Sequence, residues 1–408
     1  MNYQETIDYL YSATPVFEKI GAGAYKEGLS NSLALDEHFH HPHQHFKTIH
    51  VAGTNGKGSC SHTLAAILQA AGYKVGLYTS PHLIDFRERI KVNGLCVSEK
   101  WVVDFVKEER SFFEPLHPSF FELSTAMAFK YFAEEQVDFA VVEVGLGGRL
   151  DCTNIITPVL SVITNISFDH TQFLGHTLEA IAAEKAGIIK QHIPVVIGET
   201  TEETRLVFER KAREMNAPLY FAEAFDMKSY DDYPFELKGS YQQKNKRTIV
   251  CAAKLLGMND ESILAGLTSV CERTGLLGRW QQLSSRPLVV CDTGHNVGGW
   301  QYLSKQINEQ PCKTLRIVFG MVDDKDVGSV MQMLPRNAVY YWVQASTHRA
   351  ISHLSIKKLG KEHCLHGESF PEVWEAYQQA LSDADPDDFI FVGGSSYVVA
   401  DLLAHLQS

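Results

Sequence analysis

Residues 47–59 read KTIHVAGTNGKGS, an apolar run followed by a turn that is rich in glycine. The apolar run, Lys47–Ala52, predicts a buried strand, and the residues after the turn predict a helix over residues 59–71. Glycine lets the backbone turn tightly, and the N-terminus of a helix adds partial positive charge, so such a turn suits phosphate. We therefore expect a phosphate-binding loop at residues 53–59, with Lys57 neutralising the terminal phosphates.

The spacing of this turn differs from that of the general phosphate loop, in which four residues separate a glycine from a Gly-Lys-Ser/Thr sequence. Here three residues separate Gly53 from Lys57. Gly58 follows the lysine, where the general loop has the hydroxyl that holds magnesium. A metal ligand must then come from elsewhere in the chain. The alternative interpretation is a plain strand-to-helix turn without a ligand.

Apolar strands and helices alternate along the first part of the chain. Strands are expected at residues 74–79, 138–144, 159–164, 194–198 and 218–222, and helices at residues 101–113, 123–136, 178–190 and 201–216. Such alternation is typical of a mostly parallel sheet with helices on both faces. We expect an α/β fold whose large P-loop-type domain spans residues 1–282.

A second, shorter α/β series begins after two further helices, which are expected at residues 242–256 and 260–271. Its strands are expected at residues 286–291, 314–319, 338–343 and 389–392, and its helices at residues 297–309, 326–334, 369–382 and 396–406. These elements suffice for a smaller, Rossmann-like domain. We expect that domain at residues 283–408.

Composition excludes several classes of protein. The chain carries a formal net charge of −12 and has no dense run of Lys and Arg, which argues against nucleic-acid binding. No apolar run approaches the roughly 18–20 residues that span a bilayer. Eight cysteines are scattered without CxxC spacing, which is typical of reduced thiols in a cytoplasmic protein. They are Cys60, Cys96, Cys152, Cys251, Cys271, Cys291, Cys312 and Cys364.

Five histidines cluster between residues 38 and 45. They are His38, His40, His41, His43 and His45. Such a cluster could bind a metal, but Pro42 interrupts it and no Cys or carboxylate pattern accompanies it. We therefore expect a solvated loop here.

Beyond these patterns, GTNGKGS resembles the phosphate loop of the Mur ligase superfamily. The glycine after its lysine resembles the folate branch, the folylpolyglutamate and dihydrofolate synthases. Further blocks resemble that family in the same order along nearly the whole chain. They are YTSPHL at residues 78–83, RERI at 87–90, EVGLGGRLD at 143–151, TNISFDH at 164–170, EKAGIIK at 184–190, YQQKN at 241–245, GRWQ at 278–281 and DTGHN at 292–296.

The resemblance implies an ATP-dependent ligase that activates a carboxylate as an acyl phosphate and joins it to the amine of L-glutamate. It implies four catalytic residues, which are Lys57, Glu143, His170 and Lys185. It implies nucleotide contacts from Gly53, Thr54, Asn55, Gly56, Lys57, Gly58, Ser59, Asn245, Arg279, Asp292 and His295. Thr293 departs from the family, which usually has Ala or Gly there.

Two magnesium sites are also implied by the resemblance, with ligands from Ser80, Glu143, His170 and a carbamylated Lys185. The chemistry is reasonable because Mg²⁺ prefers oxygen ligands, and Glu143 ends a strand where open α/β sheets bind ligands. Each residue also has a structural alternative. Glu143 could cap a helix or form a salt bridge, His170 could be a structural hydrogen-bonding group, and Lys185 could lie on a solvated helix face. A role for potassium is left open.

On the substrate side, the resemblance implies contacts from Gly28, Leu29, Ser80, Pro81, His82, Phe121 and Glu122. The first two belong to the segment Tyr25–Leu29, which resembles the part that touches the pterin. In the smaller domain, residues 323–326 (DDKD) resemble a loop that faces the cleft, although a solvated charged turn fits them nearly as well.

Two rival functions remain open at this point. A peptidoglycan Mur ligase would share the phosphate loop, but such enzymes usually carry a further N-terminal domain, and only 46 residues precede the first central strand here. A P-loop nucleotide switch would need neither the Glu143, His170 and Lys185 set nor a second domain.

The substrates expected from the resemblance are ATP, L-glutamate, 7,8-dihydropteroate and folates. The sequence SPHL at residues 80–83 looks more like the bifunctional bacterial enzymes than the single-activity ones, so we expect both activities. We expect a monomer that binds neither nucleic acid nor membrane.

Overall fold

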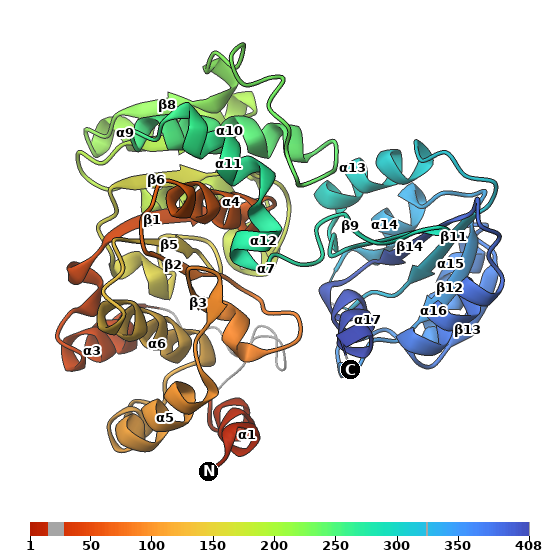
Figure 1. Cartoon of the computed structure of the whole chain (residues 1–408), viewed down its shortest axis with the longest axis horizontal. Helices are drawn as coiled ribbons and strands as arrows, with labels where there is room; N and C mark the ends of the chain where they lie inside the picture. Colours follow the sequence, from red (N-terminus) through yellow and green to blue (C-terminus); the bar gives the residue numbers. More distant parts are fainter. Residues whose placement is uncertain (15–27, 324, 408) are drawn as a thin grey trace. The chain divides into compact units, whose positions relative to one another are not determined.

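The computed structural model describes residues 1–14, 28–323 and 325–407. The chain divides into two compact units. Unit 1 comprises Met1–Glu236 and Gln242–Leu276, and unit 2 comprises Leu237–Tyr241 and Leu277–Ser408. Each unit contains its own sheet (Figure 1). The division that the sequence predicts between residues 282 and 283 stays a prediction.

A mostly parallel sheet forms the centre of unit 1. Its strand order over the described residues is β4-β3-β2-β5-β1-β6-β7-β8, in which only β3 runs in the opposite direction to the other strands. The strands are β1 (Lys47–Ala52), β2 (Val75–Tyr78), β3 (Ile90–Val92), β4 (Leu95–Cys96), β5 (Phe139–Glu143), β6 (Leu160–Ile163), β7 (Val195–Ile197) and β8 (Leu219–Phe221). The central strands are buried on both faces, as their continuous apolar sequences require.

Helices cover both faces of this sheet, and Figure 1 shows α4 and α6 on opposite sides of it. The α-helices are α1 (Tyr3–Ala13), α3 (Ser30–His38), α4 (Lys57–Ala70), α5 (Glu99–Phe113), α6 (Phe120–Glu134), α7 (Thr171–Leu174), α8 (Leu178–Lys185), α9 (Glu202–Glu214), α10 (Gln242–Leu255), α11 (Asp260–Thr268) and α12 (Val270–Thr274). The 3-10 turns are η2 (Pro42–His45), η3 (Phe86–Arg89), η4 (Glu114–Leu116), η5 (Cys152–Ile155), η6 (Ala186–Ile188) and η7 (Ala222–Ala224).

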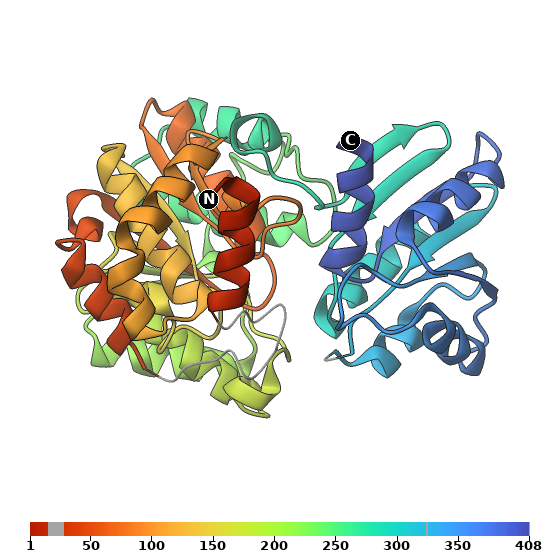
Figure 2. The same cartoon turned by 90° about the horizontal axis from the view of Figure 1, so that it is seen from below.

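Helix α4, which begins at Lys57, is the most enclosed of these helices. Every residue from Gly58 to Leu68 is buried, because α4 lies between the sheet and the helices α10, α11 and α12. Gly266 of α11 permits close approach, since a Cβ atom there would lie 2.4 Å from the Ile67 side chain. On the periphery of the unit, α1 lies beside α5 in both views (Figures 1 and 2).

Unit 2 is a smaller α/β layer structure. Its strand order in the described part of the chain is β13-β12-β11-β14-β10-β9, and only β9 is antiparallel. The strands are β9 (Gln281–Ser285), β10 (Leu288–Asp292), β11 (Leu315–Phe319), β12 (Val339–Val343), β13 (Gly367–Phe370) and β14 (Phe389–Gly393). The helices are α13 (Val297–Asn308), α14 (Val327–Met333), α15 (His353–Glu362), α16 (Val373–Ser382) and α17 (Ser396–Gln407). Trp300 and Trp342 are fully buried in its core.

The predicted α/β fold class is confirmed, and all the predicted strands are present with ends shifted by a few residues. The helix expected over residues 260–271 is instead two helices, α11 and α12. The hairpin β3–β4, the edge strands β9 and β13, and α15 were not predicted. All eight cysteines are free thiols, as expected. Within the described ranges, no helix combines the length and the apolar character that a membrane span requires.

Candidate active site

Three loops that carry predicted site residues leave the sheet at one edge. Strand β1 lies between β5 and β6, and all three are parallel, with Val51 opposite Glu143 and Ala52 opposite Ile163. The loops that follow these strands therefore begin side by side at the carboxyl ends. In open α/β sheets, ligands bind at such an edge where neighbouring connections diverge.

The phosphate-binding loop is braced on one side by the segment after β6. Gly53 has φ 145°, and a Cβ atom there would lie 1.8 Å from Thr164 Oγ1, so only glycine fits. The backbone N–H of Thr54 donates to the Asn165 carbonyl at 2.9 Å, and that of Asn55 donates to Asn165 Oδ1, also at 2.9 Å. The sequence placed Thr164 and Asn165 in a family block but assigned no role to either.

Helix α10 braces the other side of the loop. Gly56 has φ 85°, and a Cβ atom there would lie 2.4 Å from Asn245 Oδ1. Asn245 donates to Gln242 Oε1 at 2.8 Å, and Gln242 donates to the Ser59 hydroxyl at 3.0 Å. The structure thus brings the predicted residue Asn245 to the loop. Gln242 was missed as an individual residue, although it lies in the YQQKN block.

Two ammonium groups meet at the start of this loop. Lys57 Nζ donates to the carbonyl oxygens of Gly53 at 3.1 Å and Thr54 at 3.2 Å. Lys185 Nζ, which is buried at the end of α8, donates to the same Gly53 oxygen at 3.0 Å. Burial, and then the positive charge of Lys57, lower the pKa of Lys185 to about 7. Lys185 is therefore not on a solvated helix face, and part of its population is neutral near neutral pH.

The predicted metal ligands lie around the same edge. Glu143 ends β5 and is 4% exposed, and its charge adds to burial in raising the pKa of the Cys60 thiol on α4. His170 has a left-handed backbone at the start of α7, and its Nε2 lies 3.9 Å from Asp169 Oδ1. Within the described residues, no group of three or more His, Cys, Asp or Glu side chains could hold a metal ion.

The predicted substrate loop at Ser80–Leu83 is held through His82. The His82 Nε2 atom lies 2.9 Å from the Tyr11 hydroxyl, and Arg89 Nε donates to His82 Nδ1 at 2.7 Å. Because Arg89 occupies Nδ1, the proton of a neutral His82 lies on Nε2. The loop is thereby tied both to α1 and to the buried Arg89.

Phe121 and Glu122 begin α6 close to the Glu143 loop. A Cβ atom on Gly145 would lie 2.5 Å from the Phe121 ring. The Glu122 carboxylate accepts from the backbone N–H of Ser119 at 2.6 Å and so completes the capping box of α6. Glu122 therefore has a structural role whether or not it contacts substrate.

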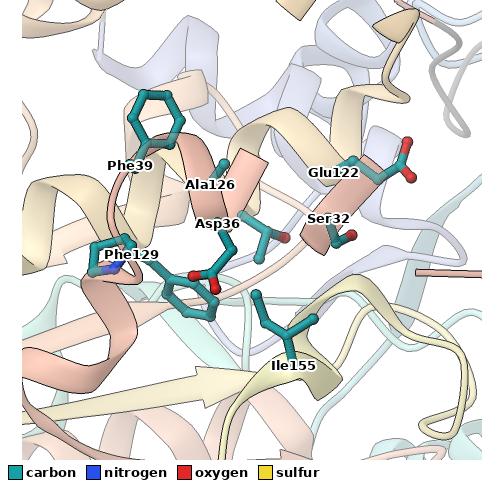
Figure 3. Close-up of a pocket in the computed structure, with 9 residues that line it drawn as sticks. Ser32, Asp36, Phe39, Glu122, Ala126, Phe129 and Ile155 are labelled. Carbon is teal, nitrogen blue, oxygen red and sulfur yellow. The ribbon is translucent and has the colours of Figure 1, made fainter. Parts of the chain in front are cut away.

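A small pocket, partly open to solvent, lies beside Glu122 (Figure 3). It is formed by α3, α6, η2 and η5. Its lining residues are Ser32, Asp36, Phe39, Pro42, Glu122, Thr125, Ala126, Phe129 and Ile155. Gly28 and Leu29 immediately precede α3, with Gly28 at φ 104° and open space around its Cα. Tyr25, Lys26 and Glu27 lie outside the described residues.

In unit 2, Asp292 organises the loop that carries the other predicted nucleotide contacts. Its Oδ2 accepts from the Tyr241 hydroxyl at 2.8 Å and the Trp280 N–H at 2.7 Å, while Oδ1 accepts from the Gly294 N–H at 2.8 Å. Burial raises the pKa of Asp292, and the charge of Arg279 opposes that shift. His295 Nδ1 lies 3.0 Å from the Thr293 carbonyl.

Two further predictions from the sequence have structural outcomes. In the charged segment 323–326, Asp326 caps α14 through the Ser329 N–H at 3.0 Å, and Asp324 lies outside the described residues. In the histidine cluster, His41 Nδ1 and His43 Nδ1 contact the two oxygens of Asp36 at 2.6 and 2.7 Å. These contacts pin the turn η2 to α3, so part of the expected solvated loop is an ordered hydrogen-bonded cluster.

Both units match models of Mur ligase domains. Residues 51–259 match the Mur ligase middle domain, and residues 278–396 match the glutamate ligase domain of Mur ligases. The folylpolyglutamate synthase of Lacticaseibacillus casei is 34% identical over an alignment that covers 98% of this chain and 97% of that protein. The dihydrofolate synthase/folylpolyglutamate synthase of Bacillus subtilis is 33% identical, and the alignment covers 94% of this chain and 95% of that protein.

Solved structures of folate enzymes are also similar to this chain. E. coli FolC in complex with DHPP and ADP has a TM-score of 0.86 and 30% identity, with 100% of this chain and 98% of that chain covered. A bifunctional folylpolyglutamate synthase/dihydrofolate synthase from Yersinia pestis, complexed with AMPPNP and Mn ion, gives the same TM-score, identity and coverage. By sequence and by fold, this chain belongs to the folylpolyglutamate synthase and dihydrofolate synthase family of the Mur ligase superfamily.

Proposed function

We propose that this chain is an ATP-dependent ligase that adds L-glutamate to 7,8-dihydropteroate and to folate (poly)glutamates. The observation that carries the proposal is the braced loop at residues 53–59, which places Lys57 and the N-terminus of α4 beside Glu143 and Lys185. A plain turn would need neither the crowded glycines nor two lysines on one carbonyl oxygen.

The chemistry proceeds through an activated carboxylate. A carboxylate acylates amines poorly, because oxide is a poor leaving group. Transfer of the γ-phosphoryl group of ATP to the carboxylate oxygen gives an acyl phosphate and ADP. The amine of L-glutamate then attacks the carbonyl carbon, the C–O bond to phosphate breaks, and an amide and inorganic phosphate form after loss of a proton.

This chain's contribution to phosphoryl transfer is positioning and charge neutralisation. Lys57 is the first residue of α4, so its side chain and the N-terminus of that helix lie at the same edge of the sheet, whereas the Thr54 and Asn55 N–H groups hold the loop to Asn165. Lys57 Nζ now contacts the Gly53 and Thr54 carbonyls, and it would exchange these for phosphate oxygens when nucleotide binds. Donors fixed in place before the reaction stabilise developing charge with little reorganisation.

The donor set fits magnesium, because Glu143 offers a buried carboxylate opposite Val51, just before the phosphate-binding loop, and Ser80, which follows β2, offers a hydroxyl. When bound, the ion would draw charge from the phosphate oxygens. We further propose a second magnesium site, with His170 and a carbamylated Lys185 as ligands. Lys185 fits that modification because carbon dioxide reacts with neutral amines, and its pKa of about 7 supplies one.

Folate substrates are favoured over peptidoglycan precursors, because the compared relatives are folate enzymes that align along nearly their entire length. A nucleotide switch is disfavoured, because the family match includes a glutamate ligase domain. Monomeric state and cytoplasmic location stay predictions. A role for potassium remains open and can be tested by exchanging potassium for sodium salts in the assay below.

The test is an assay of purified chain with ATP, Mg²⁺ and labelled glutamate, with dihydropteroate or tetrahydrofolate as the acceptor. We expect glutamate-dependent ADP release with both acceptors. Lys57→Ala and Glu143→Ala should lower kcat by at least about a hundredfold, with circular dichroism unchanged. Lys100→Ala, which alters an exposed lysine, is the matched control. Turnover without glutamate would contradict the ligase, and full activity of either site variant would contradict its role.

A further inference from the structure

Three buried polar side chains connect the strand before the phosphate-binding loop to the segment after Glu143. His50 lies on β1 and is fully buried, with its Nε2 2.8 Å from the Thr153 hydroxyl. Thr153, in η5, is also fully buried, and its hydroxyl donates to Asp151 Oδ1. The Thr153 backbone N–H donates to the same oxygen at 3.0 Å. No role was assigned to His50 or Thr153 from the sequence.

The direction of these hydrogen bonds follows from the carboxylate. Burial raises the pKa of Asp151, but both of its oxygens accept from backbone N–H groups, of Thr153 and Leu146, which favour the carboxylate. A carboxylate can only accept, so the single hydroxyl proton of Thr153 is directed to it. His50 must then donate from Nε2, which leaves Nδ1 unprotonated. Nδ1 has no hydrogen-bond partner among the described residues, as this tautomer allows. Burial, and then the charge of Lys190, lower the pKa of His50 to about 3, so the ring is neutral.

The second oxygen of Asp151 holds the loop that follows Glu143. Asp151 Oδ2 accepts from the Leu146 N–H at 2.9 Å, and the Asp151 N–H donates to the Gly148 carbonyl at 3.2 Å. Both contacts lie within a few residues of Glu143. Asp151 therefore holds the two ends of the segment 146–151 together, and Glu143 lies just before this segment in the chain.

The same loop packs against the end of α8, which carries Lys185. The Arg149 N–H donates to the Glu184 carbonyl at 2.8 Å. A Cβ atom on Gly148 would lie 2.8 Å from the Glu184 carbonyl oxygen and 3.0 Å from that of Lys185. A displacement of the loop would therefore displace the backbone that carries Lys185.

We propose that His50, Thr153 and Asp151 act together as positioning residues for the nucleotide and metal site. They hold the loop after Glu143 (residues 144–151) and the end of α8, which carries Lys185, at a fixed position relative to β1. This inference rests on the proposed function. The three residues act through Glu143 and Lys185 and do not touch the substrate. A buried carboxylate with its partners is costly compared with apolar side chains of similar size, so its presence here favours a task beyond stability.

The kinetic test compares Thr153→Val, which removes the hydroxyl, with Thr153→Ser, which keeps it. We expect Thr153→Val to raise the Mg²⁺ concentration for half-maximal rate and to lower kcat/KM for ATP by roughly 10- to 100-fold. The KM for the folate acceptor should stay within about twofold, and Thr153→Ser should restore most of the loss. Thr6→Val is the matched control, because Thr6 is also fully buried and its hydroxyl donates to the carbonyl of Asn2, the N-cap of α1. An unchanged Mg²⁺ dependence in Thr153→Val, or an equal change in Thr6→Val, would overturn the proposal.

A second test needs neither substitution nor activity. Nitrogen-15 NMR of histidine-labelled wild-type chain should show His50 as the Nε2–H tautomer, without protonation, from about pH 8 to about pH 5. An Nδ1–H tautomer, or protonation within that range, would overturn the assigned hydrogen bonds. Because this signal is independent of turnover, failure of the glutamate assay would reject the proposed function without being confused with failure of this inference.

Discussion

Lys57 and Lys185 both donate to the carbonyl oxygen of Gly53, so two ammonium groups share one acceptor. Like charges so close cannot both stay protonated without cost, and the more deeply buried group loses its proton more readily. That group is Lys185, which is 4% exposed and has a pKa of about 7. The site therefore combines the side chain of Lys57 with an amine, that of Lys185, which can become a nucleophile.

This difference predicts a pH-dependent modification. The unfolded lysine has a pKa of 10.5 and stays charged at neutral pH, whereas the folded Lys185 becomes progressively neutral as pH rises through about 7. We therefore expect the carbamate on Lys185 to increase with pH across that window. Carbon-13 NMR with labelled bicarbonate would detect it as one signal in the wild type that is absent from Lys185→Met. A signal of equal size in that variant would show that another amine reacts.

At the scale of the element, the turn between β1 and α4 tolerates no side chain at Gly53. Substitutions at two glycines in unit 1 can distinguish the destabilising effect of a positive φ from that of steric crowding. Gly53 and Gly72 both have positive φ, 145° and 89°, but a Cβ atom meets Thr164 Oγ1 at 1.8 Å in the first case and nothing within 4 Å in the second. We expect Gly72→Ala to cost about 1 kcal/mol of stability, from conformation alone.

Gly53→Ala should cost more, about 3 kcal/mol or above, because Thr164 and the loop must also move. It should also abolish binding of an ATP analogue, whereas Gly72→Ala should leave binding unchanged. Urea unfolding and calorimetric titration measure the two effects. Equal losses of stability in the two variants would mean that the close contact between Gly53 and Thr164 does not contribute to the stability of the loop.

At the scale of the whole molecule, three hydrophobic core clusters of described residues each lie within a single unit, two in unit 1 and one in unit 2. We therefore expect urea unfolding in two steps. Tryptophan fluorescence should follow unit 2, which contains four of the five tryptophans, while circular dichroism should follow both units. Trp101 lies in unit 1, and the others are Trp280, Trp300, Trp342 and Trp374.

A magnesium nucleotide analogue at about 100 times its Kd should stabilise unit 1 by about 2.7 kcal/mol, seen in the circular dichroism transition. Lys57→Ala should remove this stabilisation. Coincident transitions by both probes would instead mean that the chain unfolds as one cooperative body.

Sequence patterns predicted the features that depend on local order. Strand β1, the start of α4 and the alternation of the remaining strands follow from apolar runs and glycine positions, and the structure confirms them. The family relationship, predicted from blocks such as GTNGKGS and EVGLGGRLD, is confirmed by the domain matches. Local pattern sufficed here because buried parallel strands are continuously apolar.

Features that depend on distant residues were not predictable in this way. The braces on the phosphate-binding loop come from Thr164, Asn165 and Gln242, which only the folded chain brings near Gly53. The burial of Lys185 depends on the loop that packs against the end of α8. Strand β9, which reads QQLSS and has no fully buried residue, lacks the apolar run that marks a central strand. The short hairpin β3–β4 is likewise specified by its partner strand.

The close fit between Gly53 and Thr164 also limits how such a sequence can evolve. A larger residue at position 53 becomes acceptable only in a lineage that has already shortened the side chain at position 164. Even then little room is gained, because the Thr164 Cβ atom would still lie 3.1 Å from the new group. The two positions are therefore epistatic, and the order in which mutations occur decides which descendants retain a working enzyme.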